Sequence, residues 1–310
     1  MYHVILFYKI QHIQHPENEI KLHREICRAL QLKGRVIMNE DGVNGIVGGT
    51  ETHIAMYRAY MDGHRLFKKI DFKESLSTFN PFPNLQVKYR KEIITTSSRE
   101  QFNLQNRGKH VSRDTFHQWL VDGEPMVLVD MRNDYEWAIG RFKGTRQPRM
   151  KYFRELIETL GDYADVKDKK MVMYCTGGVR CEPASAIFIA NGFQQKNVYQ
   201  LEGGIVTYAE KYGNEGFYEG KIFMFDDRMA IPAGDESITG ICGNCHHCDA
   251  PCDIYRNCSN RFCNTLFLGC KSCTQMFENT CSVECKEIVQ NIVNLRPVSA
   301  NHVVIPHRNK

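Results

Sequence analysis

The residues of this chain best suited to chemistry lie at positions 175–181, where the sequence reads Cys-Thr-Gly-Gly-Val-Arg-Cys. An apolar run at 171–174 predicts a buried strand that leads directly into Cys175, and residues 182–191 are typical of a helix. The two glycines allow the backbone to curl so that several N–H groups point inward, and the helix contributes its positive N-terminal end. This order of strand, loop and helix predicts a cradle for an anion.

The sulfur of Cys175 lies at the base of the predicted cradle, where we expect a lowered thiol pKa and a large fraction of thiolate. Arg180 adds a fixed positive charge at the rim. Such a layout suits a nucleophilic sulfur that carries a persulfide, a phosphate or a sulfenate. We therefore predict catalytic roles for Cys175 and Arg180, and an anion-binding loop formed by Thr176, Gly177, Gly178, Val179 and Cys181.

Two alternatives stay open for this loop. Cys175 can be an inert buried thiol at the end of a strand, because cysteine is among the most often buried residues. Cys181 can either resolve an oxidised Cys175 or simply occupy the first position of the helix.

A second group of reactive residues lies near the C-terminus, where ten of the thirteen cysteines fall between positions 242 and 285. The C-x2-C spacing occurs at 242/245, 245/248 and 270/273, and such pairs hold tetrahedral zinc. One compact set of four is Cys270, Cys273, Cys281 and Cys285, and the other is Cys242, Cys245, Cys258 and Cys263. Cross-braced pairing fits the spacing equally well, and His246 or His247 can replace a thiolate. Disulfides and an iron–sulfur cluster are the alternatives to structural zinc.

The composition is that of a globular protein: 310 residues, net charge +4, 42% hydrophobic and 25% charged. It excludes a mostly disordered chain and a fibrous or heptad repeat. No segment reaches the roughly 18 apolar residues of a membrane-spanning helix, and residues 1–9 predict a strand rather than a signal peptide. We expect a soluble cytoplasmic protein without membrane association, whose cysteines are thiols or metal ligands.

The pattern of elements predicts three parts. Residues 1–95 predict a ferredoxin-like (acylphosphatase-like) domain, with strands at 3–9, 34–39, 46–47 and 67–72, helices at 17–32 and 51–62, a turn at 40–45, and a later strand at 85–90. Residues 96–225 alternate strands and helices and predict an α/β domain with helices on both faces of a sheet. Residues 226–310 are the predicted metal-binding tail.

Several segments together resemble the rhodanese-type tRNA uridine(34) hydroxylase family. The segment from Tyr174 to Glu182 is similar to the family's CTGGIRCEKAS loop, with Val179 in place of isoleucine, and Pro183 follows in place of lysine. Glu40–Gly45, Val129–Glu136 and Ile139–Gly144 resemble the family's EGINGT, DVRNDYE and IGHFKGA segments, with Arg141 in place of the usual histidine. Leu201–Ile205 and Phe223–Arg228 also resemble family segments.

This resemblance implies a rhodanese-like central domain, and an enzyme that uses molecular oxygen to hydroxylate C5 of the wobble uridine of tRNA, giving 5-hydroxyuridine. It implies that Cys175 is the essential cysteine. The expected partner is the anticodon loop of tRNA, the expected cofactors are O2 with an unidentified electron donor and structural zinc, and no obligate protein partner is expected.

With the resemblance, the basic segment between Gly140 and Arg154 is interpreted as an RNA contact rather than a solvated loop. It has six basic residues, no acidic residue and interleaved aromatic residues, and the predicted tRNA-binding residues are Arg141, Lys143, Arg146 and Arg149. Asp130 and Arg132 are expected to pair locally, and Asp134 and Glu136 to be solvated surface charges. Gly42, Asn44 and Gly45 are interpreted either as a turn with positive φ or as a surface that faces the substrate.

Two other functions compete with hydroxylation. The same loop suits a sulfurtransferase that carries persulfide on Cys175, of the thiosulfate or tRNA-thiolating type. A non-enzymatic adaptor that binds RNA or protein through a zinc module is the third interpretation.

Overall fold

The computed structural model describes residues 1–97, 101–147 and 149–294. The chain divides into two compact units, Met1–Cys242 and Gly243–Lys310. Residues 295–310, which belong to the predicted tail, lie outside the described residues. Among the described helices, none combines the length and apolar character needed to cross a membrane.

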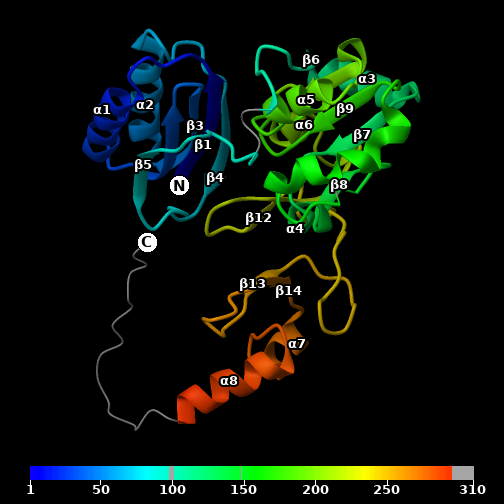
Figure 1. Ribbon diagram of the computed structural model, residues 1–310. Helices are drawn as coiled ribbons and strands as arrows, with labels where there is room; N and C mark the ends of the chain where they lie inside the picture. The colour runs from blue at the N-terminus through cyan, green and yellow to red at the C-terminus, as the bar shows by residue number, and fades with distance from the viewer. Residues whose placement is uncertain (98–100, 148, 295–310) are drawn as a thin grey trace. The chain divides into compact units, whose positions relative to one another are not determined.

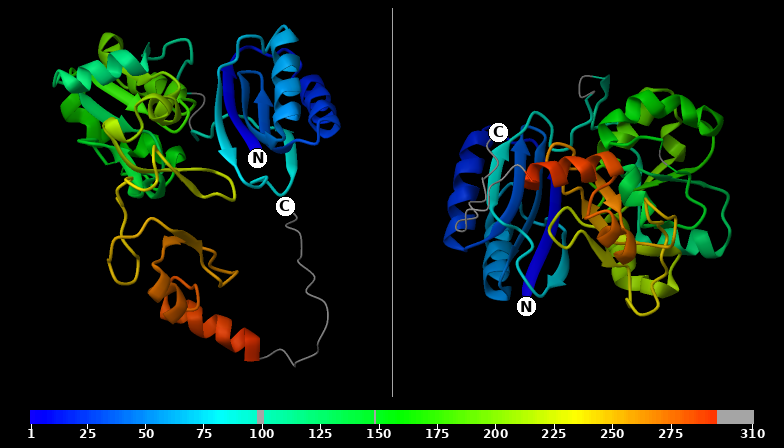
Figure 2. Two further views of the ribbon diagram at one scale, coloured as in Figure 1. Left: turned by 180° about the vertical axis from the view of Figure 1, so that it is seen from behind. Right: turned by 90° about the horizontal axis from the view of Figure 1, so that it is seen from below.

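The first unit begins with a five-stranded sheet of strand order β4-β1-β3-β2-β5, with two helices on one face (Figures 1 and 2). The first four strands pair antiparallel, and β5 runs parallel to β2. The elements are β1 Tyr2–Ile10, α1 Pro16–Ala29, β2 Lys33–Asn39, β3 Gly42–Gly49, α2 Glu51–Gly63, β4 Phe72–Ser77 and β5 Leu85–Tyr89. This confirms the ferredoxin-like arrangement, with β5 as an additional edge strand.

Side chains of this sheet alternate between its two faces. On β1, Ile5 and Phe7 are buried in the core that the helices cover, so Leu6 and Tyr8 point to the other side. Residues in register across the strands share that side: Arg35 and Leu6 both pair with Ile46, and Ile37 and Tyr8 both pair with Asn44. We call this side the helix-free face; it consists of Leu6, Tyr8, Arg35, Ile37, Asn44, Ile46 and Lys88.

Two local predictions for this domain are wrong. Residues 67–70 form turns instead of a strand, because Phe67 and Ile70 enter the core from a turn in which Lys69 has φ 61°. The turn predicted at 40–45 covers only residues 40–41, because β3 already begins at Gly42. The Asn39 side chain closes this short turn by accepting a hydrogen bond from the Asp41 N–H at 2.9 Å.

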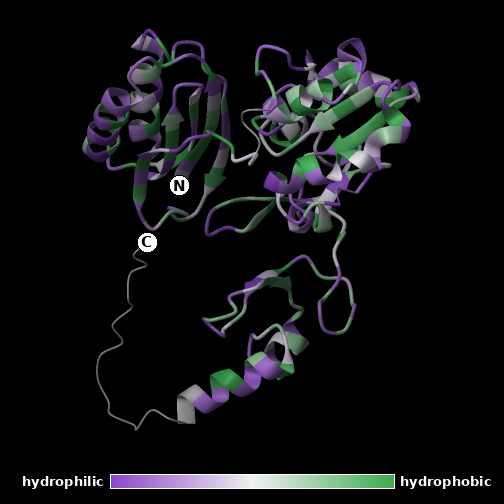
Figure 3. Ribbon diagram, in the orientation of Figure 1, coloured by the Kyte–Doolittle hydropathy of each residue, from purple (hydrophilic) through white to green (hydrophobic). Residues whose placement is uncertain are grey.

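The middle of the first unit is built on a four-stranded parallel sheet of order β6-β10-β9-β7. Its strands are β6 Lys109–Val111, β7 Val127–Asp130, β9 Met171–Tyr174 and β10 Val198–Leu201. The helices are α3 Arg113–Val121, α4 Asp134–Ala138, α5 Cys181–Ala190 and α6 Gly204–Tyr212, with 3-10 segments η2 Phe153–Val166, η3 Gln195–Asn197 and η4 Gly213–Glu215. Figure 3 shows β7 and β9 as hydrophobic strands, as expected for a sheet that is covered on both faces.

Alternate residues of these strands enter different cores. Met171 and Met173 of β9 pack with α5 and η2, whereas Val172 and Tyr174 pack with Phe116 of α3 and residues of α6. The predicted α/β domain with helices on both faces is therefore confirmed. A small antiparallel sheet of order β12-β11-β8 completes the unit, with β8 Gly140–Phe142, β11 Tyr218–Phe223 and β12 Ala230–Pro232.

The second unit is small and has few apolar residues in its core. It contains the hairpin β13 Tyr255–Asn257 and β14 Leu266–Leu268, followed by the helices α7 Lys271–Met276 and α8 Val283–Asn294. Its described core cluster consists of Phe267 with Cys258, Cys281 and Cys285. The unit starts at Gly243 rather than at the predicted residue 226, because β12 pairs with β11 in the first unit.

Candidate active site

The loop at 175–180 connects β9 to α5 and is braced by the start of α6. The backbone N–H groups of Ile205 and Val206 donate to the carbonyl oxygens of Cys175 and Thr176, each at 3.0 Å. Gly204 has φ +67°, and a Cβ there would lie 2.4 Å from the Cys175 oxygen, so only glycine allows this approach. The Gly-Gly pair of the segment at 201–205 thus fixes the shape of the loop.

Cys175 is fully buried at the base of the loop, where several groups stabilise a thiolate. The N–H of Gly178 donates to its Sγ at 3.2 Å. Burial opposes ionisation, but a hydrogen bond from Cys181, the charge of Arg180 and the N–H groups of Arg180 and Gly178 together lower the Cys175 pKa to about 6. Burial and the neighbouring Cys175 raise the pKa of Cys181, which therefore stays a thiol and a donor.

Arg180 does not stand as a free charge at the rim. Its guanidinium donates to both carboxylate oxygens of Glu136, at 2.5 and 2.7 Å, and to the Thr176 hydroxyl at 3.2 Å. Glu136 is fully buried, so its prediction as a solvated surface charge is wrong. A buried arginine needs a fixed carboxylate, and the capping box of α4 provides one, because the N–H of Asn133 holds Glu136 Oε1 at 3.1 Å.

A second buried pair supports the edge of the sheet. Arg132 and Asp130 are both fully buried and make a two-pronged contact, with Nε–Oδ1 at 2.9 Å and Nη2–Oδ2 at 2.6 Å. Arg132 also donates to the carbonyl of Gly140 at 2.6 Å. The predicted local pairing is therefore confirmed, and neither residue lines the cavity described next.

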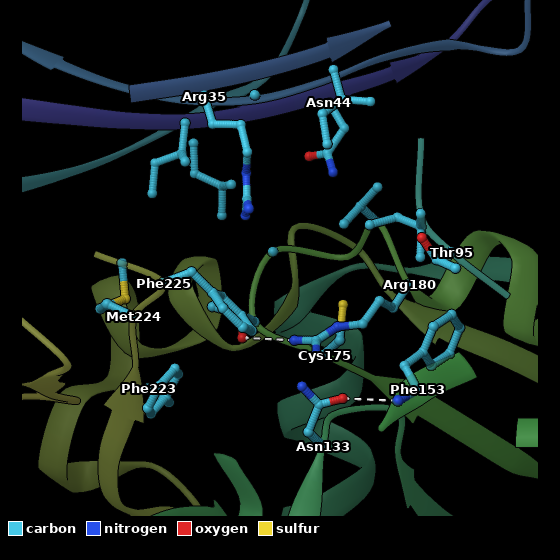
Figure 4. Close-up of a pocket in the computed structure, with 18 of the residues that line it drawn as sticks. Arg35, Asn44, Thr95, Asn133, Phe153, Cys175, Arg180, Phe223, Met224 and Phe225 are labelled. Atoms are coloured by element: carbon cyan, nitrogen blue, oxygen red, sulfur yellow. Dashed lines mark hydrogen bonds between the residues drawn. The ribbon is translucent and has the colours of Figure 1, made fainter. Parts of the chain in front are cut away.

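A cavity of about 340 Å³ lies between the loop and the helix-free face of the N-terminal sheet. Figure 4 shows Arg35 and Asn44 pointing from the N-terminal strands toward Cys175 and Arg180. The N-terminal sheet contributes Leu6, Arg35, Ile37, Asn44 and Ile46 to the lining of the cavity, and the loop contributes Cys175, Thr176, Gly177, Val179 and Arg180. Other segments of the first unit contribute Tyr152, Phe153, Phe223, Met224 and Phe225. A Cβ at Gly177 would lie 2.5 Å from the Leu6 Cδ2 atom, so a larger residue at this position would have to displace the Leu6 side chain.

Glu182 connects the two sides of the cavity from behind the loop. Its carboxylate, nearly buried, accepts hydrogen bonds from the Tyr8 hydroxyl at 3.0 Å, His110 at 3.0 Å and Arg107 at 2.8 Å. Burial opposes ionisation of Glu182, but His110 and Arg107 outweigh it and lower the pKa. Because Tyr8 belongs to β1 and Glu182 to α5, this network fixes the N-terminal sheet over the loop.

The predicted RNA-binding residues of the basic segment lie away from this cavity. Arg146 and Arg149 pair with Asp165 and Asp162 at 2.9 and 3.4 Å, and Arg141 stacks over Trp137 at 4.1 Å. Lys143 is exposed beyond β8. The four residues Arg141, Lys143, Arg146 and Arg149 do not line the cavity, whereas Tyr152 and Arg154 of the same segment do.

Among the described residues, the cysteines of the C-terminal unit form two groups of four. The first consists of Cys245, Cys248, Cys270 and Cys273, and the second of Cys258, Cys263, Cys281 and Cys285. The pairs alternate along the chain, which is the cross-braced arrangement left open by the spacing. Cys242 was predicted as a ligand but belongs to neither group, whereas Cys248, which was not predicted, belongs to the first group. Cys242 lies in the first unit, next to Gly220 of β11.

The geometry of both groups fits a tetrahedral metal ion. Four sulfurs bound at about 2.3 Å stand roughly 3.8 Å apart. Cys248 Sγ and Cys270 Sγ are 3.8 Å apart, as are the sulfurs of Cys281 and Cys285. His246 and His247 are not in the groups; their Nε2 atoms contact the carbonyls of Cys281 and Thr280, both at 2.9 Å. The unit can therefore hold metal ions through thiolates alone.

The sequence interpretation missed three of the site's residues. Arg35 and Tyr8 looked like ordinary strand residues, and Glu136 looked like a surface charge. A usable signal for Glu136 was its position three residues after Asn133, which is the spacing of a capping box. The role of Arg35 and Tyr8 depends on contacts between domains, which no local pattern encodes.

Comparisons with known proteins agree with this architecture. Residues 2–93 match the UPF0176 acylphosphatase-like domain, residues 112–211 the rhodanese-like domain, and residues 219–286 the rhodanese C-terminal domain. The chain is 38% identical over 275 residues to the tRNA uridine(34) hydroxylase of Chlamydia abortus, covering 87% of this chain and 82% of that protein. It is 36% identical over 272 residues to the tRNA uridine(34) hydroxylase of Protochlamydia amoebophila, covering 87% and 83%.

We expect the thiolate of Cys175 to form with a midpoint near pH 6, because the pKa is lowered to about 6. The measurement is the thiolate ultraviolet absorbance of the wild type minus that of Cys175→Ser across pH. Since a thiolate forms as pH rises, the signal should be nearly complete at pH 7. A midpoint near the ordinary cysteine pKa of about 8.5 would contradict this prediction.

Glu136→Gln should lower the free energy of unfolding by about 3 kcal/mol, because it leaves the buried Arg180 without its carboxylate. Urea unfolding measures this loss. The control is Glu210→Gln, which removes an exposed ion pair with Arg113 and should cost less than about 1 kcal/mol. Equal effects of the two changes would mean that the Glu136–Arg180 pair has no special structural role.

Proposed function

The chain belongs to the tRNA uridine(34) hydroxylase family, and we propose that it hydroxylates C5 of the wobble uridine of tRNA in the cavity over Cys175. The observation that carries this proposal is the position of a low-pKa thiol in a cavity whose size suits a small ligand such as one base. A wobble base lies in a single-stranded loop and can enter such a cavity without opening a duplex.

The walls of the cavity suit a uracil ring. The side chains of Tyr152 and Phe225 are more than a third exposed, so their rings are available for stacking on a base. The Asn44 amide is oriented by its hydrogen bond to the Ile93 carbonyl at 3.1 Å, and its oxygen has no hydrogen-bond partner among the described residues. That oxygen is a suitable acceptor for the N3–H of uracil, which cytosine lacks.

The reaction needs an oxidant and two electrons. Uridine C5–H, O2, two electrons and two protons give C5–OH and one water. We propose molecular oxygen as the oxidant, with the electron donor unidentified. In one route, the Cys175 thiolate adds to C6 and makes C5 nucleophilic toward an oxygen species, and the thiolate leaves after C5 loses its proton. In the other route, O2, two electrons and two protons convert the Cys175 thiol, or the outer sulfur of its persulfide, to an S–OH group and one water; the OH is then transferred to C5 in exchange for the C5 hydrogen, which restores the S–H group.

Both routes assign the same task to the loop. Its N–H groups and Arg180 hold negative charge on or near the sulfur, where water is excluded and such contacts are strongest. Because Glu136 balances the charge of Arg180, the loop stabilises one thiolate without gathering a large excess of positive charge. The Cys181 thiol donates a hydrogen bond to the Cys175 sulfur.

For the C-terminal unit we propose two structural zinc ions, one in each cross-braced group of four cysteines. With so little apolar core in this unit, metal binding would supply much of its folding free energy. Zinc is favoured over an iron–sulfur cluster because sulfurs about 3.8 Å apart suit a single tetrahedral ion.

The hydroxylase proposal is tested by nucleoside mass spectrometry of tRNA from bacteria that lack their own wobble-uridine hydroxylases and express this chain. We expect 5-hydroxyuridine with the wild type in air, and none with Cys175→Ala or under nitrogen. Cells supply the electron donor, so absence of the product in air would refute the hydroxylase. A sulfur-containing uridine would instead support the sulfurtransferase.

The zinc proposal predicts two zinc ions per wild-type chain by elemental analysis. Cys248→Ala should lower the content to about one, because it removes a ligand of the first group. Cys242→Ala is the matched control and should keep both ions. Loss of zinc from the Cys242 variant but not from the Cys248 variant would overturn the proposed ligand sets.

A further inference from the structure

Three basic residues lie together on the helix-free side of the N-terminal sheet, next to the cavity. Arg35 is on β2 and Lys88 is on β5, and the register pairs Lys88 with Ile37, two residues after Arg35. Arg90 follows β5 and, two residues after Lys88, points to the same side. The strand neighbours Val36, which follows Arg35, and Val87, which precedes Lys88, are buried on the side of the helices. We call Arg35, Lys88 and Arg90 the basic cluster.

No described carboxylate forms an ion pair with the basic cluster. Among the described residues, the Lys88 ammonium donates to the amide oxygen of Gln86, at 2.8 Å. Two other cations of this domain do form ion pairs, Arg58 with Glu74 and Lys73 with Asp71. Burial and the nearby charges of Arg90 and Arg35 lower the pKa of Lys88, and burial and Arg90 lower that of Arg35. The three charges therefore repel one another and would gain free energy from a bound anion.

The basic cluster is continuous with the proposed catalytic site, because Arg35 also lines the cavity that contains Cys175. Figure 4 shows the Arg35 side chain extending from its strand toward the loop. If the base of a nucleotide occupies the cavity, its phosphates lie outside the cavity. Arg35 lines the cavity, and Lys88 and Arg90 extend from it along the helix-free face of the sheet.

Three of the four predicted RNA-binding residues of the basic segment are already engaged in other contacts. Its Arg146 and Arg149 already pair with aspartates, and Arg141 lies over Trp137. A phosphate must compete with these contacts, whereas at the basic cluster it meets cations that have no described counter-charge.

We propose that the basic cluster binds the phosphates of the RNA strand that flank the uridine in the cavity, so that the N-terminal domain holds the tRNA backbone while the rhodanese-like domain supplies the reactive sulfur. This inference rests on the proposed function. Its physical basis is the attraction of clustered, unpaired cations for successive phosphates and the release of counterions on binding.

The test compares two double variants of equal charge. Lys88→Ala/Arg90→Ala removes two members of the basic cluster. Lys21→Ala/Arg28→Ala removes two exposed cations of α1, on the opposite face of the same sheet. Each is titrated with an anticodon stem-loop RNA whose wobble base is uridine, at several salt concentrations. Thermal unfolding checks that both variants are folded.

We expect the cluster variant to bind roughly tenfold or more weakly at low salt, and its slope of log Kd against log salt to fall by about 2, close to 1 for each lost phosphate contact. The α1 variant should bind like the wild type. Equal affinities of the two variants would overturn the proposal.

Two further results separate this proposal from its alternatives. If Arg141→Ala/Lys143→Ala weakens binding and reduces the slope while the cluster variant does not, the backbone lies on the basic segment and the proposal is wrong. If the cluster variant loses RNA affinity although the wild type makes no 5-hydroxyuridine, the RNA surface stands and the proposed reaction fails. The RNA-binding proposal and the proposed hydroxylation can therefore be refuted separately.

Discussion

The structure of the first unit depends on the contact between the helix-free face of the N-terminal sheet and the Cys175 loop. Leu6, Ile37 and Ile46 would leave an apolar surface in water if nothing covered that face. Gly177 allows the loop to approach Leu6, and Tyr8 reaches across to Glu182. The same contact that covers the sheet also encloses the cavity, so a change that separates the two domains would dismantle the site.

Around the Cys175 loop, buried charged residues have oppositely charged or hydrogen-bonding partners. Arg180 is matched by Glu136, Arg132 by Asp130, and Glu182 by Arg107 and His110. Several hydrogen bonds offset the free-energy cost of removing each of these charged groups from water. Together, these contacts keep the loop rigid around one thiolate. The basic cluster is different, because its charges have no described carboxylate partner. The paired charges around the loop hold the shape of the chain, whereas we propose that the unpaired charges of the basic cluster contact RNA.

The sequence predicts local features well and contacts between distant segments poorly. The strand, loop and helix around Cys175 follow from an apolar run, two glycines and a helical pattern, all within about 20 residues. The partnership of Arg180 with Glu136 joins residues 44 positions apart, and that of Tyr8 with Glu182 joins residues 174 apart. Similarly, spacing alone indicated thiolate metal sites but could not decide between consecutive and cross-braced pairs, because that choice depends on how β13, β14 and α7 fold around them. The segment at 67–70 was mistaken for a strand because apolar residues in a turn and in a strand can look alike.

The central claim is that the wobble uridine lies between the N-terminal sheet and the Cys175 loop. The most direct measurement is photocrosslinking of the protein to an anticodon stem-loop RNA with 4-thiouridine at the wobble position, followed by mass spectrometry of the crosslinked peptides. We expect crosslinks in β3, around Asn44, and in the loop that begins at Cys175. Crosslinks confined to the basic segment at 141–149 or to the C-terminal unit would contradict it.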